Sequence, residues 1–264
     1  MDRINLGIST CPNDTFIFGA MIRGDIEVPF ELRVVMDDVQ LLNNVAIKEQ
    51  LDVVKVSFGV YPEIKDNYKI LKCGGALGFG CGPLVLSKNY KTMEELRGKK
   101  IAIPGVNTTA FMVLKRYFSH IFQDFIPMRF DLIMPAIENG EVDAGLVIHE
   151  GRFTYENYGL TKIADLGCVW EDNNNLPIPL GFIGIHKSKY YMADKVNDTI
   201  RRSIEFAYKN EEATYNFAKK YAQSMEDDVM KSHVGLYVND FSKDLSKAED
   251  AISELLGISK DVFI

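Results

Sequence analysis

One histidine stands where a side chain could exchange a proton with a ligand. The apolar run from Ala144 to Ile148 follows the turn Asn139-Gly140 and ends at His149. A short apolar run of this kind predicts a buried strand of a parallel sheet. Ligands of open α/β sheets bind just beyond the carboxyl ends of such strands. Because an imidazole changes charge near neutral pH, His149 is a candidate general base. The alternative is a histidine packed at a strand end and bonded to a neighbouring carbonyl.

A lysine and a serine close a second short predicted strand, residues 53–56. Lys55 and Ser57 project to the same side if the strand continues through Val56, because strand side chains alternate with a period of two. An ammonium and a hydroxyl in this place could hold a carboxylate. The alternative is a solvent-facing lysine, the usual environment of this residue type.

The first predicted strand, Arg3 to Ser9, runs into a helix start that offers backbone amides to a polar or anionic group. Pro12 stops the strand, and Asn13 or Asp14 is expected to cap a helix that Gly24 ends. The polar or small residues of this turn are Ser9, Cys11, Asn13 and Asp14. An ordinary strand-to-helix turn has the same pattern.

A second helix start follows the predicted strand Lys100 to Ile103. Asn107 is the expected N-cap, and Thr108 and Thr109 then add two hydroxyls and two amides at a helix N-terminus. This arrangement suits an anion, although it is also a normal helix start.

The cysteines and histidines do not form a metal motif. No CxxC pair occurs, and neither set has zinc-type spacing, so we expect no metal. A chain of this length needs no disulfide staple, so reduced thiols are expected. The residues in question are Cys11, Cys73, Cys81 and Cys168, and His120, His149, His186 and His233.

Composition narrows the class of partner. The 264 residues are 47% hydrophobic and 25% charged, with a net charge of −7. This is an ordinary globular composition that argues against a nucleic-acid or anionic-membrane surface and leaves a small molecule as the expected ligand. No stretch approaches the roughly 18 apolar residues of a membrane span. The N-terminus lacks the apolar core of a secretory signal, so a cytoplasmic protein is expected, with no prediction of its oligomeric state.

The predicted elements alternate strand and helix in two runs, which indicates an α/β fold with two lobes. Residues 1–87 and 180–264 are expected to form a discontinuous first lobe, and residues 88–179 an inserted second lobe. The glycine-rich residues 73–82 fit no nucleotide-binding fingerprint, and residues 170–179 are expected to be a polar loop. The candidate residues would face one cleft between the lobes, which closes like a hinge.

Several segments of the chain resemble the 1,4-dihydroxy-6-naphthoate synthases nearly end to end. The most specific are Cys-Pro-Asn-Asp-Thr-Phe from Cys11 and His-Glu-Gly-Arg-Phe-Thr-Tyr from His149. The others are Lys55 to Ser57, Gly74 to Gly78, Thr108 with Thr109, and Tyr237 to Ser242. Thr10 stands where relatives often have proline, a small departure that affects no assigned role.

This resemblance implies a type II periplasmic-binding-protein-like fold and a place in menaquinone biosynthesis by the futalosine route. It implies a lyase that converts cyclic dehypoxanthinyl futalosine into 1,4-dihydroxy-6-naphthoate with release of dihydroxyacetone, without a cofactor. It places the proton acceptor on His149 and substrate binding on Lys55, Val56 and Ser57 and on Thr108 and Thr109.

Two other functions are compatible with the same fold. A non-catalytic solute-binding protein would need no histidine at this place and would carry a signal peptide. Chorismate dehydratase, an enzyme of the same pathway, is the second alternative, and the two specific segments favour the synthase over it.

Overall fold

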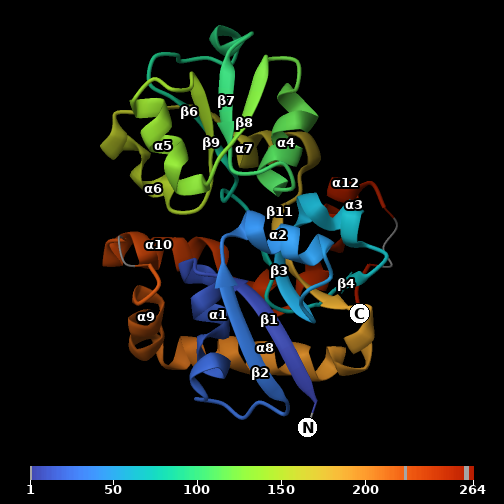
Figure 1. Ribbon diagram of the computed structural model, residues 1–264. Helices are drawn as coiled ribbons and strands as arrows, with labels where there is room; N and C mark the ends of the chain where they lie inside the picture. The colour runs from blue at the N-terminus through green and yellow to red at the C-terminus, as the bar shows by residue number, and fades with distance from the viewer. Residues whose placement is uncertain (1, 223–224, 259–261) are drawn as a thin grey trace. The chain divides into compact units, whose positions relative to one another are not determined.

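The computed structural model describes residues 2–222, 225–258 and 262–264 of the chain. The chain divides into two units: unit 1 is Met1–Gly78 with Pro179–Ile264, and unit 2 is Phe79–Ile178. Each unit is a sheet covered by helices (Figure 1). Among the described residues, no helix combines the length and apolar character needed to cross a bilayer.

Unit 1 contains a mixed sheet in the order β2-β1-β3-β11-β4, with β5 paired to β11. β1 is parallel to both β2 and β3, whereas β11 runs antiparallel to β3 and β4. The strands are β1 (Arg3–Ser9), β2 (Glu31–Asp37), β3 (Val53–Ser57), β4 (Tyr68–Ile70), β5 (Ala76–Gly78) and β11 (Ile178–His186).

The helices of unit 1 bury the apolar faces of its strands. α1 packs against α8 and α9 (Figure 1), and its Phe16 and Phe18 join Ile200 and Ile204 of α8 in one core with β1. The α-helices described here are α1 (Pro12–Arg23), α2 (Val39–Ile47), α3 (Tyr61–Ile64), α8 (Ala193–Lys209), α9 (Glu211–Lys219), α10 (Asp227–Tyr237), α11 (Asp240–Lys243) and α12 (Glu249–Leu256).

Unit 2 contains a five-stranded sheet in the order β10-β6-β9-β7-β8. β7 is parallel to β8 and β9, and β6 runs antiparallel to β9 and β10. The strands are β6 (Leu84–Ser87), β7 (Lys100–Ile103), β8 (Asp124–Pro127), β9 (Ala144–Val147) and β10 (Thr161–Asp165), and the α-helices are α4 (Thr109–Phe118), α5 (Phe130–Glu138), α6 (Gly151–Thr154) and α7 (Leu166–Asn174).

The two units repeat one connection pattern. In unit 1 the chain runs β1-α1-β2-α2-β3 with β1 between the other two strands, and in unit 2 it runs β7-α4-β8-α5-β9 with β7 in the middle. Each unit therefore has a topological switch point where the strand order reverses, between β1 and β3 and between β7 and β9. Ligands of α/β sheets bind beyond the carboxyl ends of the strands at such points.

The structure differs from the sequence prediction at the first domain boundary. The first crossing between the units lies at Gly78 and Phe79, ahead of β6, because β6 pairs with β9 and β10 of unit 2. The predicted lobe boundary after residue 87 left this strand in the first lobe. The glycine-rich residues 73–82 also contain β5, which pairs with β11.

The predicted loop at residues 170–179 was wrong over its first half. α7 begins because the Asp165 carboxylate accepts from the Gly167 amide at 2.9 Å, which satisfies an orphan donor of the first turn. Trp170 is fully buried and its Nε1 donates to the Pro177 carbonyl at 3.1 Å. Asn175 ends the helix in the left-handed conformation with φ 54°. The asparagines therefore form the last turn and cap of a helix.

Candidate active site

The candidate residues lie at the two switch points. Ser9 ends β1, Cys11 and not Asn13 or Asp14 is the N-cap of α1, and Asn13 and Asp14 lie in its first turn. Lys55 lies in the middle of the neighbouring strand β3, which Ser57 ends. In unit 2, Thr108 and Thr109 start α4 after β7, and His149 follows β9. The two sets occupy equivalent positions in the repeated pattern, which is where the topology predicts a ligand.

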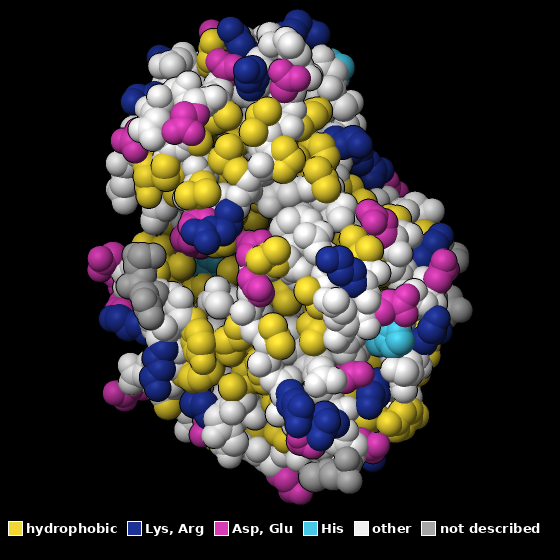
Figure 2. Space-filling view, viewed as in Figure 1, with side chains coloured by type: hydrophobic (Ala, Val, Ile, Leu, Met, Phe, Trp, Pro, Cys, Tyr) yellow, Lys and Arg dark blue, Asp and Glu magenta, His cyan; other side chains and the backbone are white. Residues whose placement is uncertain are grey.

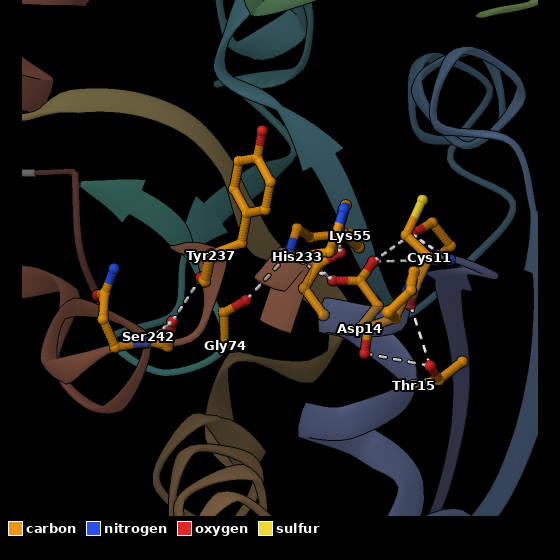
Figure 3. Close-up of polar contacts among 12 residues, drawn as sticks. Cys11, Asp14, Thr15, Lys55, Gly74, His233, Tyr237 and Ser242 are labelled. Carbon is orange, nitrogen blue, oxygen red and sulfur yellow. Dashed lines mark hydrogen bonds and ion pairs between the residues drawn. The ribbon is translucent and has the colours of Figure 1, made fainter. Parts of the chain in front are cut away.

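The carboxylate of Asp14 is the centre of the unit 1 set (Figure 3). Its Oδ1 accepts from Lys55 Nζ at 2.7 Å and from Asn13 Nδ2 at 3.0 Å. Its Oδ2 accepts from the hydroxyl and the amide of Ser9 at 2.7 and 3.1 Å. Asp14 is fully buried, so four donors fill the roughly four lone-pair sites of a carboxylate. Asp14 therefore has no open position from which to act as a base.

Lys55 is a buried cation with its charge balanced. Its Nζ donates to Asp14 and to the carbonyl of Gly74 at 3.2 Å. Its aliphatic stem passes Gly181 so closely that a Cβ there would lie 3.2 Å from Lys55 Cε. The solvent-facing alternative for this lysine is wrong, because the side chain is only 6% exposed.

Ser57 is held by a residue of α2 that the sequence did not single out. Asn43 Oδ1 accepts from the Ser57 amide at 2.9 Å, and Asn43 Nδ2 donates to Ser57 Oγ at 3.2 Å. Val56 between the two candidates is fully buried and pairs with Phe182 of β11. Val56 therefore fixes the strand with its side chain in the core, while its neighbours carry the polar groups.

Thr108, and not Asn107, is the N-cap of α4. The Thr108 hydroxyl accepts from the Phe111 amide at 3.2 Å and donates to the Gly105 carbonyl at 2.8 Å. The predicted cap was thus one residue too early, because the chain turns at Gly105 before the helix begins. Thr108 and Thr109 are both only 2% exposed. The Thr108 hydroxyl shapes the turn, so any anion would be held chiefly by backbone amides.

His149 lies two residues beyond the end of β9, in a strained conformation. Its φ is 57°, in the left-handed region that non-glycine residues seldom occupy. The imidazole is half-buried and lies edge-on to the Phe130 ring at 4.9 Å between centroids. The turn behind it is tight, because a Cβ on Gly151 would come within 2.3 Å of Val147 Cγ1. Strain of this kind persists only where the surroundings enforce it, and it concentrates at functional sites.

Arg152 fixes the segment that carries His149. Its Nη1 donates to the Gly82 carbonyl at 2.7 Å and its Nη2 pairs with Asp165 Oδ2 at 2.5 Å. Gly82 and Gly167 pass so closely that a Cβ on Gly82 would lie 2.1 Å from the Gly167 nitrogen. The arginine of the His-Glu-Gly-Arg segment therefore ties α6 to the sheet and to α7.

The thiols do not favour nucleophilic chemistry. Burial raises the pKa of Cys73 to about 11 and that of Cys81 to about 12, and the thiolate is the reactive form. Cys11 is buried at the turn into α1, and Cys168 is exposed. Among the described residues, no group of three or more potential ligands could hold a metal.

Asn43, Arg152 and His233 are the site residues that sequence reasoning missed. His233 is fully buried on α10, and its Nε2 lies 3.0 Å from Asn13 Oδ1, 220 positions away (Figure 3). Its position within a helix predicts a structural or solvated side chain, and the structural alternative is confirmed, although no local pattern indicated the contact with Asn13. Only Arg152 carried a local signal, its place within the segment that starts at His149. The visible face of each unit shows no charged patch that would indicate a further ligand site, because basic and acidic side chains are interspersed over it (Figure 2).

Comparison with known proteins identifies relatives across the whole chain. The sequence profile of a family described as menaquinone biosynthesis matches residues 4–261. A 1,4-dihydroxy-6-naphthoate synthase of Thermus thermophilus is 40% identical over 259 residues, which cover 97% of this chain and 93% of the relative. A 1,4-dihydroxy-6-naphthoate synthase of Streptomyces coelicolor is 41% identical over 262 residues, with 97% and 92% covered.

Solved structures agree on the fold. Protein AF1704 of Archaeoglobus fulgidus is 33% identical, with a TM-score of 0.91 and coverage of 97% and 96% of the two chains. The periplasmic aliphatic sulphonate binding protein of Escherichia coli is 12% identical with a TM-score of 0.68, covering 97% and 86%. The second likeness concerns the fold alone. The expected periplasmic-binding-protein-like α/β fold is confirmed, while the cleft expected between the lobes stays a prediction.

Proposed function

Because the chain belongs to the menaquinone biosynthesis family, we propose that it is a carbon–carbon lyase that forms 1,4-dihydroxy-6-naphthoate. The observation that carries this proposal is the identity of 40% and 41% to two synthases of that name over 97% of the chain. The proposed substrate is cyclic dehypoxanthinyl futalosine and the second product is dihydroxyacetone. A cytoplasmic location goes with this biosynthetic role as a prediction.

The reaction needs a base and a place for developing charge. A hydroxyl on the ring carbon loses its proton and becomes a ring carbonyl while the bond from that carbon to the three-carbon fragment breaks. The electron pair of that bond passes onto the ketone of the fragment as an enolate, whose carbon takes up a proton so that dihydroxyacetone leaves, and the ring carbonyl enolises to give the aromatic diol. Atoms and electrons balance within the substrate, so no water, oxidant or reductant enters. Formation of the aromatic ring supplies the thermodynamic pull.

His149 is the proposed base. It follows β9 at a switch point, its ring is held against Phe130, and its backbone is locked in the left-handed region. These features restrict the ring to few orientations, and a positioned base contributes about 10²–10⁴-fold to a rate. A neutral imidazole would take the hydroxyl proton and could return it to the enolate carbon of the departing fragment.

The binding groups are proposed to come from Lys55, Val56, Ser57, Thr108 and Thr109. Ser57 accepts from Asn43, which leaves its own hydroxyl proton for a substrate oxygen. Thr108 and Thr109 stand at the N-terminus of the ten-residue helix α4, whose dipole favours an acidic group such as the substrate carboxylate. Each unit thus contributes polar groups to the proposed ligand binding: Lys55 and Ser57 in unit 1, and Thr108 and Thr109 in unit 2.

The test is a direct assay of the purified protein. Incubation with cyclic dehypoxanthinyl futalosine should yield 1,4-dihydroxy-6-naphthoate and dihydroxyacetone in equal amounts, measured by liquid chromatography and mass spectrometry. Chorismate, supplied separately, should be returned unchanged. Consumption of chorismate alone would favour the dehydratase, and binding of either compound without conversion would favour a solute-binding protein.

A further inference from the structure

The Asp14–Lys55 pair has a feature that its role in the fold does not explain. An ammonium has three donors, and Lys55 uses two of them, for Asp14 and for the Gly74 carbonyl. Within residues 2–222, 225–258 and 262–264, no acceptor for the third is found. Lys55 is the middle residue of β3, and its side chain reaches Asp14 at the switch point between β1 and β3. One N–H of a buried, fixed ammonium is therefore available to a ligand oxygen.

The balance of charge decides which oxygen this donor suits. Asp14 Oδ1 lies 2.7 Å from Lys55 Nζ, so the pair as a whole is neutral, and a permanent carboxylate would meet the Asp14 charge just behind the ammonium. An oxygen that is neutral in the bound substrate and gains charge during the reaction meets less repulsion at the start. Donors fixed in advance stabilise such charge selectively in the transition state.

A second layer of contacts holds the Asp14 carboxylate in place. Asn13 Nδ2 donates to Asp14 Oδ1, the same oxygen that accepts from Lys55. The side-chain oxygen Oδ1 of Asn13 lies 3.0 Å from His233 Nε2, and the His233 ring lies 4.6 Å from that of Tyr237. Asn13 and His233 are 6% and 0% exposed. The chain of contacts ties α10 to the turn into α1 and fixes the direction of the carboxylate.

We propose that Lys55 is a charge-balanced hydrogen-bond donor to the substrate oxygen that becomes negative on carbon–carbon cleavage, and that Asp14 is its positioning residue. Asn13 and His233 support Asp14 in this role. The proposal rests on the proposed function and deepens it, because it assigns Lys55 to the transition state and leaves the substrate carboxylate to other groups. A clamp for the carboxylate would instead require an unbalanced cation.

The test compares turnover with affinity in the variants Lys55→Met, Asp14→Asn and the double variant. Affinity for 1,4-dihydroxy-6-naphthoate is measured by calorimetry, independently of turnover. Lys55→Met should lower kcat at saturating substrate by roughly 10²-fold or more, the loss seen when one fixed donor to a developing oxyanion is removed, and should keep product affinity within a few-fold. Asp14→Asn should also lower kcat, with product affinity unchanged or tighter because the ammonium is then unbalanced.

A double-variant cycle separates positioning from a merely structural role. If Asp14 acts through Lys55, Asp14→Asn should have no further effect on kcat in the Lys55→Met background. The double variant removes both charges, so it also guards against misfolding caused by one unpaired charge. His233→Gln, which keeps a donor for Asn13, should retain more kcat than His233→Leu. Lys65→Met, at an exposed lysine of unit 1, is the matched control.

Two results would overturn the proposal. One is a Lys55→Met protein that keeps kcat and loses product affinity, which is the behaviour of a carboxylate clamp. The other is additive effects of Asp14→Asn and Lys55→Met on kcat, which would make Asp14 structural. Failure of the proposed function is distinguishable, because the unmodified protein would then convert no substrate at all.

Discussion

Asn43 holds Ser57 at two points, accepting from its amide at 2.9 Å and donating to its hydroxyl oxygen at 3.2 Å. Asn43 is fully buried and Ser57 is 5% exposed. Because the Ser57 oxygen already accepts from Asn43, the hydroxyl is oriented to donate its proton elsewhere. A residue of α2 thus prepares a donor at the end of β3.

The two partners should respond differently to removal. Ser57→Ala removes the hydroxyl and keeps the hydrogen bond from the Ser57 backbone N–H to Asn43. The substrate KM should therefore rise several-fold, which corresponds to the loss of one hydrogen bond worth about 0.5–1.5 kcal/mol. The Tm should change little. Asn43→Ala leaves the buried Ser57 amide without its acceptor and should lower the free energy of unfolding by about 1–3 kcal/mol. Steady-state kinetics and urea denaturation measure the two effects. Equal stability losses in both variants would contradict this division.

Arg152 should matter through the segment that it anchors. Arg152→Lys cannot reach the Gly82 carbonyl and the Asp165 carboxylate together, so stability should fall by on the order of 3 kcal/mol, as for a buried pair that is broken. Turnover should fall more than affinity, because the anchor sets the position of His149. Arg129→Lys is the control, since that arginine pairs with Asp131 at an exposed site of the same unit. A larger stability loss in the control would refute the argument.

Sequence reasoning found the residues that follow strands and missed those that hold them. His149, Lys55 and Thr108 stand at ends of apolar runs or at helix starts, where local pattern suffices to place them. Asn43 and His233 contact residues that lie 14 and 220 positions away in the sequence, and no local sequence pattern indicates such a contact. The helix α7 was missed because its polar end, residues 171–175, is typical of a loop. Burial of Trp170 and capping by the Asp165 side chain stabilise the helix at these residues.

Alkaline pH should destabilise the fold through two thiols. Burial raises the pKa of Cys73 to about 11 and that of Cys81 to about 12, from an ordinary value of 9.0. The unfolded thiols therefore ionise first, so their contribution to stability is complete below pH 9 and is lost as the pH rises towards 11 and 12. At pH 10 the loss should be on the order of 1 kcal/mol per thiol. Urea denaturation between pH 7.5 and 10 measures it.

The double variant Cys73→Ala with Cys81→Ala isolates that effect from other groups. It should start less stable, because two buried side chains become smaller, and should lose less stability between pH 8 and 10 than the unmodified protein. Parallel pH curves for the two proteins would show that the thiols do not cause the loss.

Thr108 should be more important for the α4 turn than for binding. Thr108→Ser keeps a hydroxyl that can accept from the Phe111 amide, whereas Thr108→Ala removes the cap and should cost about 1 kcal/mol of stability. Thr109→Val keeps the size of the side chain and removes only its hydroxyl. Any loss of substrate affinity in the two hydroxyl-free variants should stay within about 1–3 kcal/mol, because the backbone amides remain. An unchanged affinity in the combined variant would show that neither hydroxyl binds the substrate.

His149→Asn is the sharpest test of the base, and the backbone makes asparagine the right replacement. At φ 57° most residues are strained, whereas asparagine tolerates the left-handed region. The variant should therefore fold normally, bind substrate with similar affinity, and turn over roughly 10²-fold more slowly or worse, because the amide cannot accept the proton. In the unmodified protein, turnover should decline as the medium is acidified, since only a neutral imidazole can act. His120→Asn, at an exposed histidine of the same unit, should leave turnover unchanged. Near-normal turnover by a folded His149→Asn protein would remove His149 as the base and direct attention to Glu150, because the Asp14 carboxylate is already saturated with donors.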